Sequence, residues 1–500
     1  MRLALLGGVS LAVLASSPTL AKPAPVSNRA ILERLNALEA KVDALQQRNA
    51  ELEHALADQK ATTAAVAARP VPPAKAPSAV AQATPAPAAA AAAAPGSSAP
   101  KATTSTQWTI VPQFVSPDGN FTFKPRGILD IDYAGFNERR GGYDYNNGTS
   151  FRRGRFGFDG TAYKQFAWRI EGEWIDNKAN LLDAYVAYTG VKNFTFTLGQ
   201  LKVPAGLEAN TSDSFNEFME RGMANTAFGQ VGGERRVGAT FAYANKLVTA
   251  TAGIYGGGEA VDRNATTPGE VWSYNGRVTL EPINDTGRLL HVGASAYHVV
   301  DLAANSVTLA DRPNVRVDGG NLESVTITGG VSATGVKSGV KDATFYGLEG
   351  AGILGPFAVQ GEYSHMHLDR YLAAPSLNFD GFYVYGSLFL TGESRSFKNG
   401  TVDRLRPTRP FDPSKGNYGA VELAVRYDRI DLTDHALSPL NREGHSWTGA
   451  VNWYLNGNMR LMFNYIRFTG ENSPLVAAPV SINGTTAKGD AFATRLHFDF

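Results

Sequence analysis

The sequence predicts an all-β protein: a 16-stranded antiparallel transmembrane β-barrel preceded by an N-terminal coiled-coil helix on an Ala/Pro-rich linker. Three observations predict it. All 26 Phe, 19 Tyr and 6 Trp lie from Trp108 onward, in segments where apolar and polar residues alternate. A period of two places neighbouring residues on opposite faces of a sheet. The segments run to about ten residues and are joined by alternately short and long connections, as in barrels that cross a membrane.

Composition excludes several other classes of protein. The 500 residues contain no cysteine, so neither a disulfide framework nor a thiolate metal site is available. A formal net charge of +1 argues against a nucleic-acid binder that works through a bulk positive field. Beyond the N-terminus there is no run of about 18 apolar residues, so no transmembrane helix is expected.

Residues 1–21 read as a secretory signal peptide. Arg2 supplies the positive start, Leu3 to Leu14 the apolar stretch, and Thr19-Leu20-Ala21 the cleavage site. The protein is therefore expected to be exported.

Residues 28–60 are predicted to form a periplasmic coiled coil. Apolar residues at alternating spacings of four and three make an a/d seam, with one amide in it: Ile31, Leu35, Leu38, Val42, Leu45, Asn49, Leu52 and Leu56. A single surface helix is the alternative, but the chain offers no folded neighbour for it. The number of helices in the coiled coil is left open.

Residues 61–106 are predicted to be a linker. Residues 61–100 contain 19 Ala and 8 Pro, a composition that cannot bury a core and favours a semi-extended spacer.

The barrel is assigned to residues 120–500. Its predicted strands are 125–136, 151–164, 166–176, 181–190, 193–203, 235–244, 246–256, 270–282, 287–300, 343–354, 357–368, 378–391, 418–432, 445–455, 459–469 and 488–500. An even number places both barrel ends in the periplasm and is wide enough for a water-filled channel.

Parity within the strands predicts which charges face the lumen. If Phe156 and Phe158 face lipid, Arg153 and Arg155 face inward, because a lipid-facing arginine near the midplane would cost about 2–4 kcal/mol. The same test places further charges inside: Arg169, Arg236, Arg277, Arg426, Arg460, Arg495, Glu171, Glu173, Glu281, Glu362, Glu422 and Asp428. Many arginines are therefore expected to pair with carboxylates along the wall. An arginine left over at a constriction would attract anions.

The loop Pro204–Glu234 is predicted to narrow the lumen. It contains Phe215, Phe218, Met219 and Phe228, which can anchor it against the wall. A loop held inside brings its basic neighbours near the channel axis.

The connection Gly392–Asn417 is long and basic for the periplasmic end, where turns are normally short. We expect it to fold inward; a solvated periplasmic flap is the alternative.

The barrel resembles the phosphate-selective porin O and P family over about residues 120–500. The resemblance rests on stretches that include "FRRGRFGFDGTAYKQFAWRIEGEW", "LLDAYVAYTG", "TLGQLKVPAGLEANTSDSFNEFMERGM", "YGLEGAGILGPFAVQGEY" and "LTGESRSFKNGTVDRLRPTRPF", in this order. It implies a trimer of sixteen-stranded barrels, an inward third loop and rows of Arg and Lys that guide anions.

Carried over residue by residue, the resemblance implies an anion pathway of Lys202, Arg221, Arg235, Arg236, Arg153, Arg155, Arg404, Arg406 and Arg409. The third loop departs from this pattern because it is acidic, with Glu208, Asp213, Glu217 and Glu220.

The predicted function is a passive channel for small anions, with phosphate or related oxyanions first, in the outer membrane of a Gram-negative bacterium. The alternative is a weakly selective general porin whose coiled coil also tethers the outer membrane to the cell wall. The expected partners are small anions, a homotrimer, outer-membrane lipid and lipopolysaccharide, with peptidoglycan the candidate partner of the coiled coil.

No enzyme, cofactor, metal or nucleic-acid partner is expected. Ser214 shows no legible base or orienting group, and His365 and His367 are interpreted as rim or lumen residues. Gly256-Gly257-Gly258 lacks the following helix that a phosphate-cradling loop requires.

Overall fold

The computed structural model describes residues 105–108, 111–140, 143–229, 231, 233–257, 271–302, 305–474 and 486–500. The predicted signal peptide, the coiled coil and nearly all of the linker lie outside the described residues.

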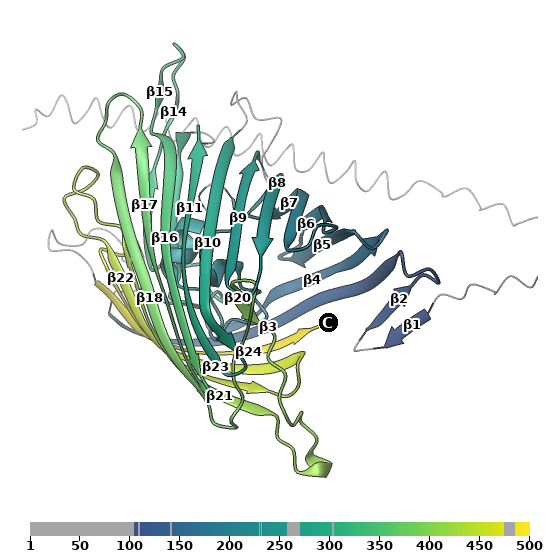
Figure 1. Ribbon diagram of the computed structural model, residues 1–500. Helices are drawn as coiled ribbons and strands as arrows, with labels where there is room; N and C mark the ends of the chain where they lie inside the picture. Colours follow the sequence, from purple (N-terminus) through teal and green to yellow (C-terminus); the bar gives the residue numbers. More distant parts are fainter. Residues whose placement is uncertain are drawn as a thin grey trace, which may run out of the picture. The chain divides into compact units, whose positions relative to one another are not determined.

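Sixteen antiparallel strands form a closed barrel (Figure 1). They are β3 (Thr122–Arg140), β4 (Gly148–Ala162), β5 (Phe166–Ile175), β6 (Lys178–Tyr188), β7 (Phe194–Lys202), β8 (Arg235–Ala244), β9 (Val248–Tyr255), β10 (Trp272–Asp285), β11 (Arg288–Val300), β16 (Val340–Leu354), β17 (Phe357–Arg370), β18 (Leu377–Phe389), β21 (Ala420–Asp431), β22 (Glu443–Tyr454), β23 (Met459–Glu471) and β24 (Thr486–Asp499). Pairing of β24 with β3, for example Leu496 with Ile131, closes the ring. The predicted architecture is confirmed, and each predicted strand overlaps one barrel strand.

The two faces of the wall differ as the alternation requires. Large apolar side chains such as Phe156 and Leu348 are exposed on the outside, whereas Arg277, Glu349 and Arg426 are buried inside. A membrane-spanning sheet must satisfy every backbone polar group internally, and ring closure does so.

One end of the barrel carries tight turns, which we call the short-turn end. Gly287 and Gly355 lie in adjacent turns there with φ of 70° and 58°, and the Gly355 N–H donates to the Gly287 carbonyl at 2.7 Å. These left-handed backbone angles favour glycine.

Smaller elements were not predicted from the sequence. The hairpin β1 (Ser105–Trp108) and β2 (Pro112–Val115) joins β3 through the pairing of Phe114 with Phe123 and lies outside the ring (Figure 1). The other small strands are β12 (Val307–Asp311), β13 (Glu323–Ile327), β14 (Gly330–Val331), β15 (Lys337–Ser338), β19 (Ser396–Lys398) and β20 (Thr401–Asp403).

Short helices complete the described structure: α2 (Leu207–Asn210), α3 (Met223–Gly229) and the 3₁₀ helix η2 (Pro413–Lys415). None of the described helices has the length and apolar character needed to span a bilayer.

Apolar residues partly fill the barrel at the end opposite the short-turn end, where the long loops lie. Met223 and Phe228 of α3 join Leu309 and Val325 of the β12–β13 hairpin in one buried cluster. The loop that contains α3 and the connection 301–339 are thus packed together inside the mouth.

The outer face provides a test of the barrel. Leu348 lies near the middle of β16 and Leu354 at its short-turn end, and both are exposed on the same face. We expect Leu348→Arg to lower the free energy of unfolding by about 2–4 kcal/mol and Leu354→Arg by about 0–1 kcal/mol, since the cost depends on depth.

The measurement is reversible denaturant unfolding in lipid vesicles. Equal losses for the two variants would contradict the placement of this face against the bilayer.

Candidate functional site

The loop 203–234 crosses the interior of the barrel. It leaves β7 after Lys202 and returns at Arg235, which are directly paired across the two strands. Five of its backbone carbonyls accept hydrogen bonds from side chains of the opposite wall and of the connection 390–419: Phe215 from Arg395 (3.1 Å), Asn216 from Arg460 (2.8 Å), Glu217 from Asn452 (2.8 Å), Met219 from Arg495 and Glu220 from Arg426 (2.9 Å). Four of these five donors are charged arginines, which satisfy buried carbonyls well.

Side chains of the loop reinforce this attachment. Phe218, Met219 and Phe228 are buried, and the Arg426 guanidinium lies 4.6 Å from the centre of the Phe218 ring. The predicted apolar anchoring of the loop is confirmed at these three residues.

The start of α2 is held by a carboxylate from β17. The backbone N–H groups of Leu207 and Glu208 donate to Glu362 at 2.5 and 2.9 Å. Glu208 in turn accepts from the Gly222 N–H at 2.8 Å and pairs with Arg426 at 3.3 Å. Burial raises the pKa of Glu208 to about 7, although Arg426 opposes this.

A cavity of about 150 Å³ lies between the loop and the wall of β4, β7, β8, β10 and β11. Six of its lining residues are cationic: Arg152, Arg153, Lys202, Arg221, Arg236 and Arg316. Two are carboxylates, Glu220 and Glu234. We refer to this space as the cationic cavity.

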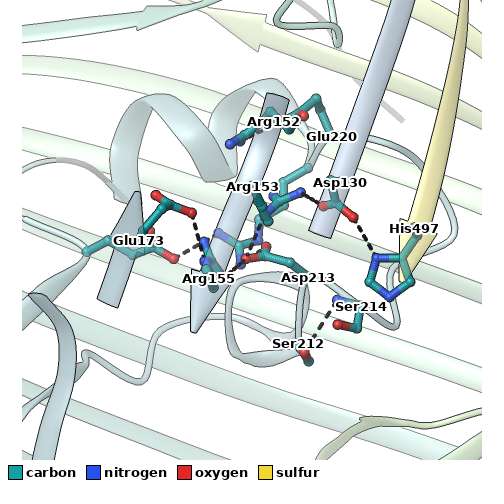
Figure 2. A network of polar contacts seen from close by, with 12 residues as sticks. Asp130, Arg152, Arg153, Arg155, Glu173, Ser212, Asp213, Ser214, Glu220 and His497 are labelled. Carbon is teal, nitrogen blue, oxygen red and sulfur yellow. Dashed lines mark hydrogen bonds and ion pairs between the residues drawn. The ribbon is translucent and has the colours of Figure 1, made fainter. Parts of the chain in front are cut away.

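Asp213 lies behind the cavity and contacts three arginines, of which Arg153 and Arg155 are labelled in Figure 2. It is 3.2 Å from Arg153, 2.8 Å from Arg155 and 2.6 Å from Arg221. Burial alone would raise the pKa of Asp213, but the three guanidiniums lower it well below its usual value. The carboxylate therefore stays charged and fixes the positions of the cations.

Glu220 has the same role on the neighbouring side. It lies 2.7 Å from Arg152, 2.8 Å from Arg495 and 2.9 Å from Arg316. These arginines lower the pKa of Glu220 well below its usual value against the effect of burial. Arg316 reaches the site from the connection 301–339.

Glu234 ends the loop and is shared by its two flanking strands. It contacts Lys202 at 3.2 Å, Arg221 at 3.0 Å and Arg235 at 3.4 Å. Arg235 also pairs with Asp183 behind the cavity at 3.0 Å.

Arg236 differs from its neighbours. It lines the cavity and is only 3% exposed. Within the described part of the chain it forms no ion pair, and its Nη1 has no hydrogen-bond partner.

The predicted basic turn divides into two parts. Its first part folds into the barrel as expected: the Phe397 ring lies 4.8 Å from that of His291, and Arg277 donates to the Gly400 carbonyl at 2.6 Å. Figure 1 shows β20 within the ring of strands and η2 projecting from it.

The arginines of this turn lie away from the cationic cavity. Arg404 is paired with Asp499 through contacts of 2.6 Å and lies over the Phe215 ring. Arg406 and Arg409 are exposed. Of the nine predicted pathway residues, the structure brings together Lys202, Arg221, Arg236 and Arg153 on the cavity surface, with Arg155 and Arg235 just behind.

Sequence reasoning missed Arg152 and Arg316. The register shifts between the pairs Asp130–Arg153 and Ile131–Phe151, so Arg152 sits at a bulge and turns inward against the strand parity. Arg316 belongs to a long connection with no periodic pattern. The adjacent pair Arg152–Arg153 was the only available signal.

The two histidines of β17 have side-chain partners on β18. His365 lies 2.8 Å from Asp380, and His367 lies 2.8 Å from Asn378. Among the described residues, no group of three or more potential ligands could hold a metal ion.

Comparisons with known proteins agree with this architecture. A family model described as "Phosphate-selective porin O and P" matches residues 123–500. Porin O of Pseudomonas aeruginosa is 28% identical over 426 residues, which cover 78% of this chain and 90% of that protein.

The comparison with solved structures gives only partial similarities. OmpT of Vibrio cholerae has a TM-score of 0.49 at 11% identity, covering 76% of this chain and 98% of the other. An anion-selective porin from Comamonas acidovorans has a TM-score of 0.48 at 14% identity, covering 76% and 100%.

The family model matches the barrel over residues 123–500, and this match identifies the family of the chain. It indicates a channel rather than an enzyme. The chain belongs to the phosphate-selective porin O and P family and is a porin of the outer membrane.

Proposed function

We propose that the protein is a passive channel for small anions, with phosphate and related oxyanions as its preferred solutes. The observation that carries this proposal is the cationic cavity, in which six basic residues surround about 150 Å³ beside a loop that narrows the lumen. Family membership supports the same solute class.

Carboxylates that each contact several cations explain how such a cavity can attract anions and still release them. Positive charges set in low-dielectric walls raise the local concentration of anions. Asp213, Glu220 and Glu234 offset part of that charge, so each contact with a passing anion stays modest. Conduction requires binding that is weak enough for release, and several modest contacts in series meet this need.

Lys202→Gln tests the selectivity. Lys202 faces the cavity, and Glu234 keeps Arg221 and Arg235 as partners when the lysine is lost. Removing one positive charge at ~5 Å in water-like surroundings raises the energy of an anion and lowers that of a cation by about 0.8 kcal/mol each, so the anion-to-cation permeability ratio should fall by up to about 16-fold.

The ratio is measured from reversal potentials in a KCl gradient across planar bilayers. Lys415→Gln is the matched control, because Lys415 pairs with Asp412 in the exposed η2 turn. A wild-type channel that prefers cations would refute the proposal. An anion-preferring channel that phosphate does not block would support the weakly selective general porin instead.

Glu208 provides a pH test. Its folded-state pKa of about 7 lies above the unfolded value of 4.5, so its stabilising contribution is present at acid pH and is lost as pH rises through 7. Protonation removes a negative charge beside Arg426, so anion preference should rise by up to about twofold as pH falls from 8 to 6.

Glu208→Gln should flatten this component of the pH profile. The difference between the two profiles isolates the contribution of Glu208 from that of other titrating groups. Asp213, Glu220 and Glu234 stay charged in this range because their pKa values are lowered. Identical profiles for wild type and variant would contradict the assignment.

We further propose that the porin is a homotrimer in contact with outer-membrane lipid and lipopolysaccharide, and that its N-terminal extension is a periplasmic tether. The a/d seam over Ile31–Leu56 would make a rod of about 45 Å for residues 31–59 at 1.5 Å per residue. On its Ala/Pro linker this rod could reach peptidoglycan.

Deletion of residues 22–104 should then leave single-channel conductance unchanged and weaken attachment of the outer membrane. Release of outer-membrane vesicles is the measurement. An intact envelope together with a loss of trimers on native gels would indicate a trimerisation device instead.

A further inference from the structure

In the part of the chain that the structure describes, four residues that line the cationic cavity have a buried polar atom without a hydrogen-bond partner: Arg153, Arg221, Arg236 and Ser273. Arg153 and Arg221 are nonetheless paired with carboxylates, which leaves Arg236 and Ser273. Arg236 Nη1 and Ser273 Oγ are both buried without a partner among the described residues. Both residues line the cavity, and their exposed fractions are 3% and 2%. Burying a hydrogen-bond donor without a partner costs free energy, so two such donors at one site need an explanation.

The strand register places the two groups on the same patch of wall. Tyr255 of β9 pairs with Gly238 of β8 on one side and with Ser273 of β10 on the other. Beyond the first pair, the Gly256 N–H donates to the Val237 carbonyl at 2.9 Å and the Val237 N–H donates to the Gly257 carbonyl at 3.3 Å, so both glycines lie opposite Val237. These glycines add no side chain next to Arg236.

Neighbouring residues of this patch have identified contacts. The Tyr297 hydroxyl donates to the Phe228 carbonyl, which fixes that ring beside the cavity. Val299, the β11 partner of Ser273, lines the same space and supplies an apolar surface. The remaining cavity cations have carboxylate partners, so Arg236 carries the uncompensated charge among the described residues.

We propose that Arg236 and Ser273 form a subsite for a tetrahedral oxyanion, and that the Ser273 hydroxyl favours oxyanions over chloride. This inference rests on the proposed function and names two groups that would give it chemical selectivity. The ligand class is an inorganic oxyanion such as phosphate or sulfate.

The chemistry separates oxyanions from halides. A guanidinium N–H and a hydroxyl that point into one space from two strands can donate to two different oxygens of a tetrahedral anion. Chloride has one centre and gains little from a second, separated donor. Removal of the hydroxyl should therefore weaken oxyanion binding more than chloride passage.

Ser273→Ala is the direct test, with the block of chloride current by added phosphate and sulfate as the readout. Loss of one hydrogen bond to a charged ligand corresponds to about a tenfold rise in the half-blocking concentration. Ser273→Thr, which restores a hydroxyl, should return it toward the wild-type value. Arg236→Gln should raise it further and lower anion preference.

Ser387→Ala is the matched control. Ser387 is also buried, and its hydroxyl also lacks a partner among the described residues, but it lies on β18 outside the lining of the cavity. Its half-blocking concentration should equal that of the wild type. The chloride current of each variant reports that the barrel has inserted.

The outcomes separate this inference from the proposed function. An anion-selective wild type whose block is unchanged in Ser273→Ala would overturn the subsite and leave the function standing. An equal rise in Ser387→Ala, or no rescue by threonine, would also overturn it. A wild-type channel without anion preference would overturn the function itself.

Discussion

The site depends on one set of interactions: arginines of the far wall and of the inward turn donate to the backbone of the loop 203–234. Arg395, Arg426, Arg460 and Arg495 bind carbonyls between Phe215 and Glu220. A guanidinium taken out of water needs several partners, and a loop laid across the lumen offers carbonyls in sequence. Without this attachment the basic residues of β4, β7 and β8 would face an open lumen with no opposing surface.

The acidic residues of the loop, which depart from the family pattern, contribute to the same arrangement of charges. Asp213, Glu220 and Glu234 each contact three cations. Clustered arginines repel one another, and a shared carboxylate holds them at fixed spacing with little loss of side-chain freedom. The arginines thus fall into two groups, those that hold the loop and those that face the cationic cavity.

Sequence patterns could predict the barrel because lipid imposes a strict rule on alternate residues. They placed Lys202, Arg221 and Arg236 near the site because these flank or lie within one long loop. They could not place Arg152, since a one-residue bulge reverses its direction, or Arg316, which arrives through tertiary packing of a distant connection. Nor could composition separate Arg404, which is partly buried and paired with Asp499, from the exposed Arg406 and Arg409.

The loop and the inward turn meet at Phe215, and this contact bears on how the channel works. Arg395 of the turn binds the Phe215 carbonyl and pairs with Glu217 and Glu422, while Arg404 covers the Phe215 ring. Residues entering from opposite ends of the barrel therefore brace the same point. A constriction fixed from both sides cannot swing as a flap without breaking buried ion pairs, which is strongly unfavourable. A fixed constriction of this kind suits a passive channel, because the proposed selectivity needs charges that keep their positions and no moving part.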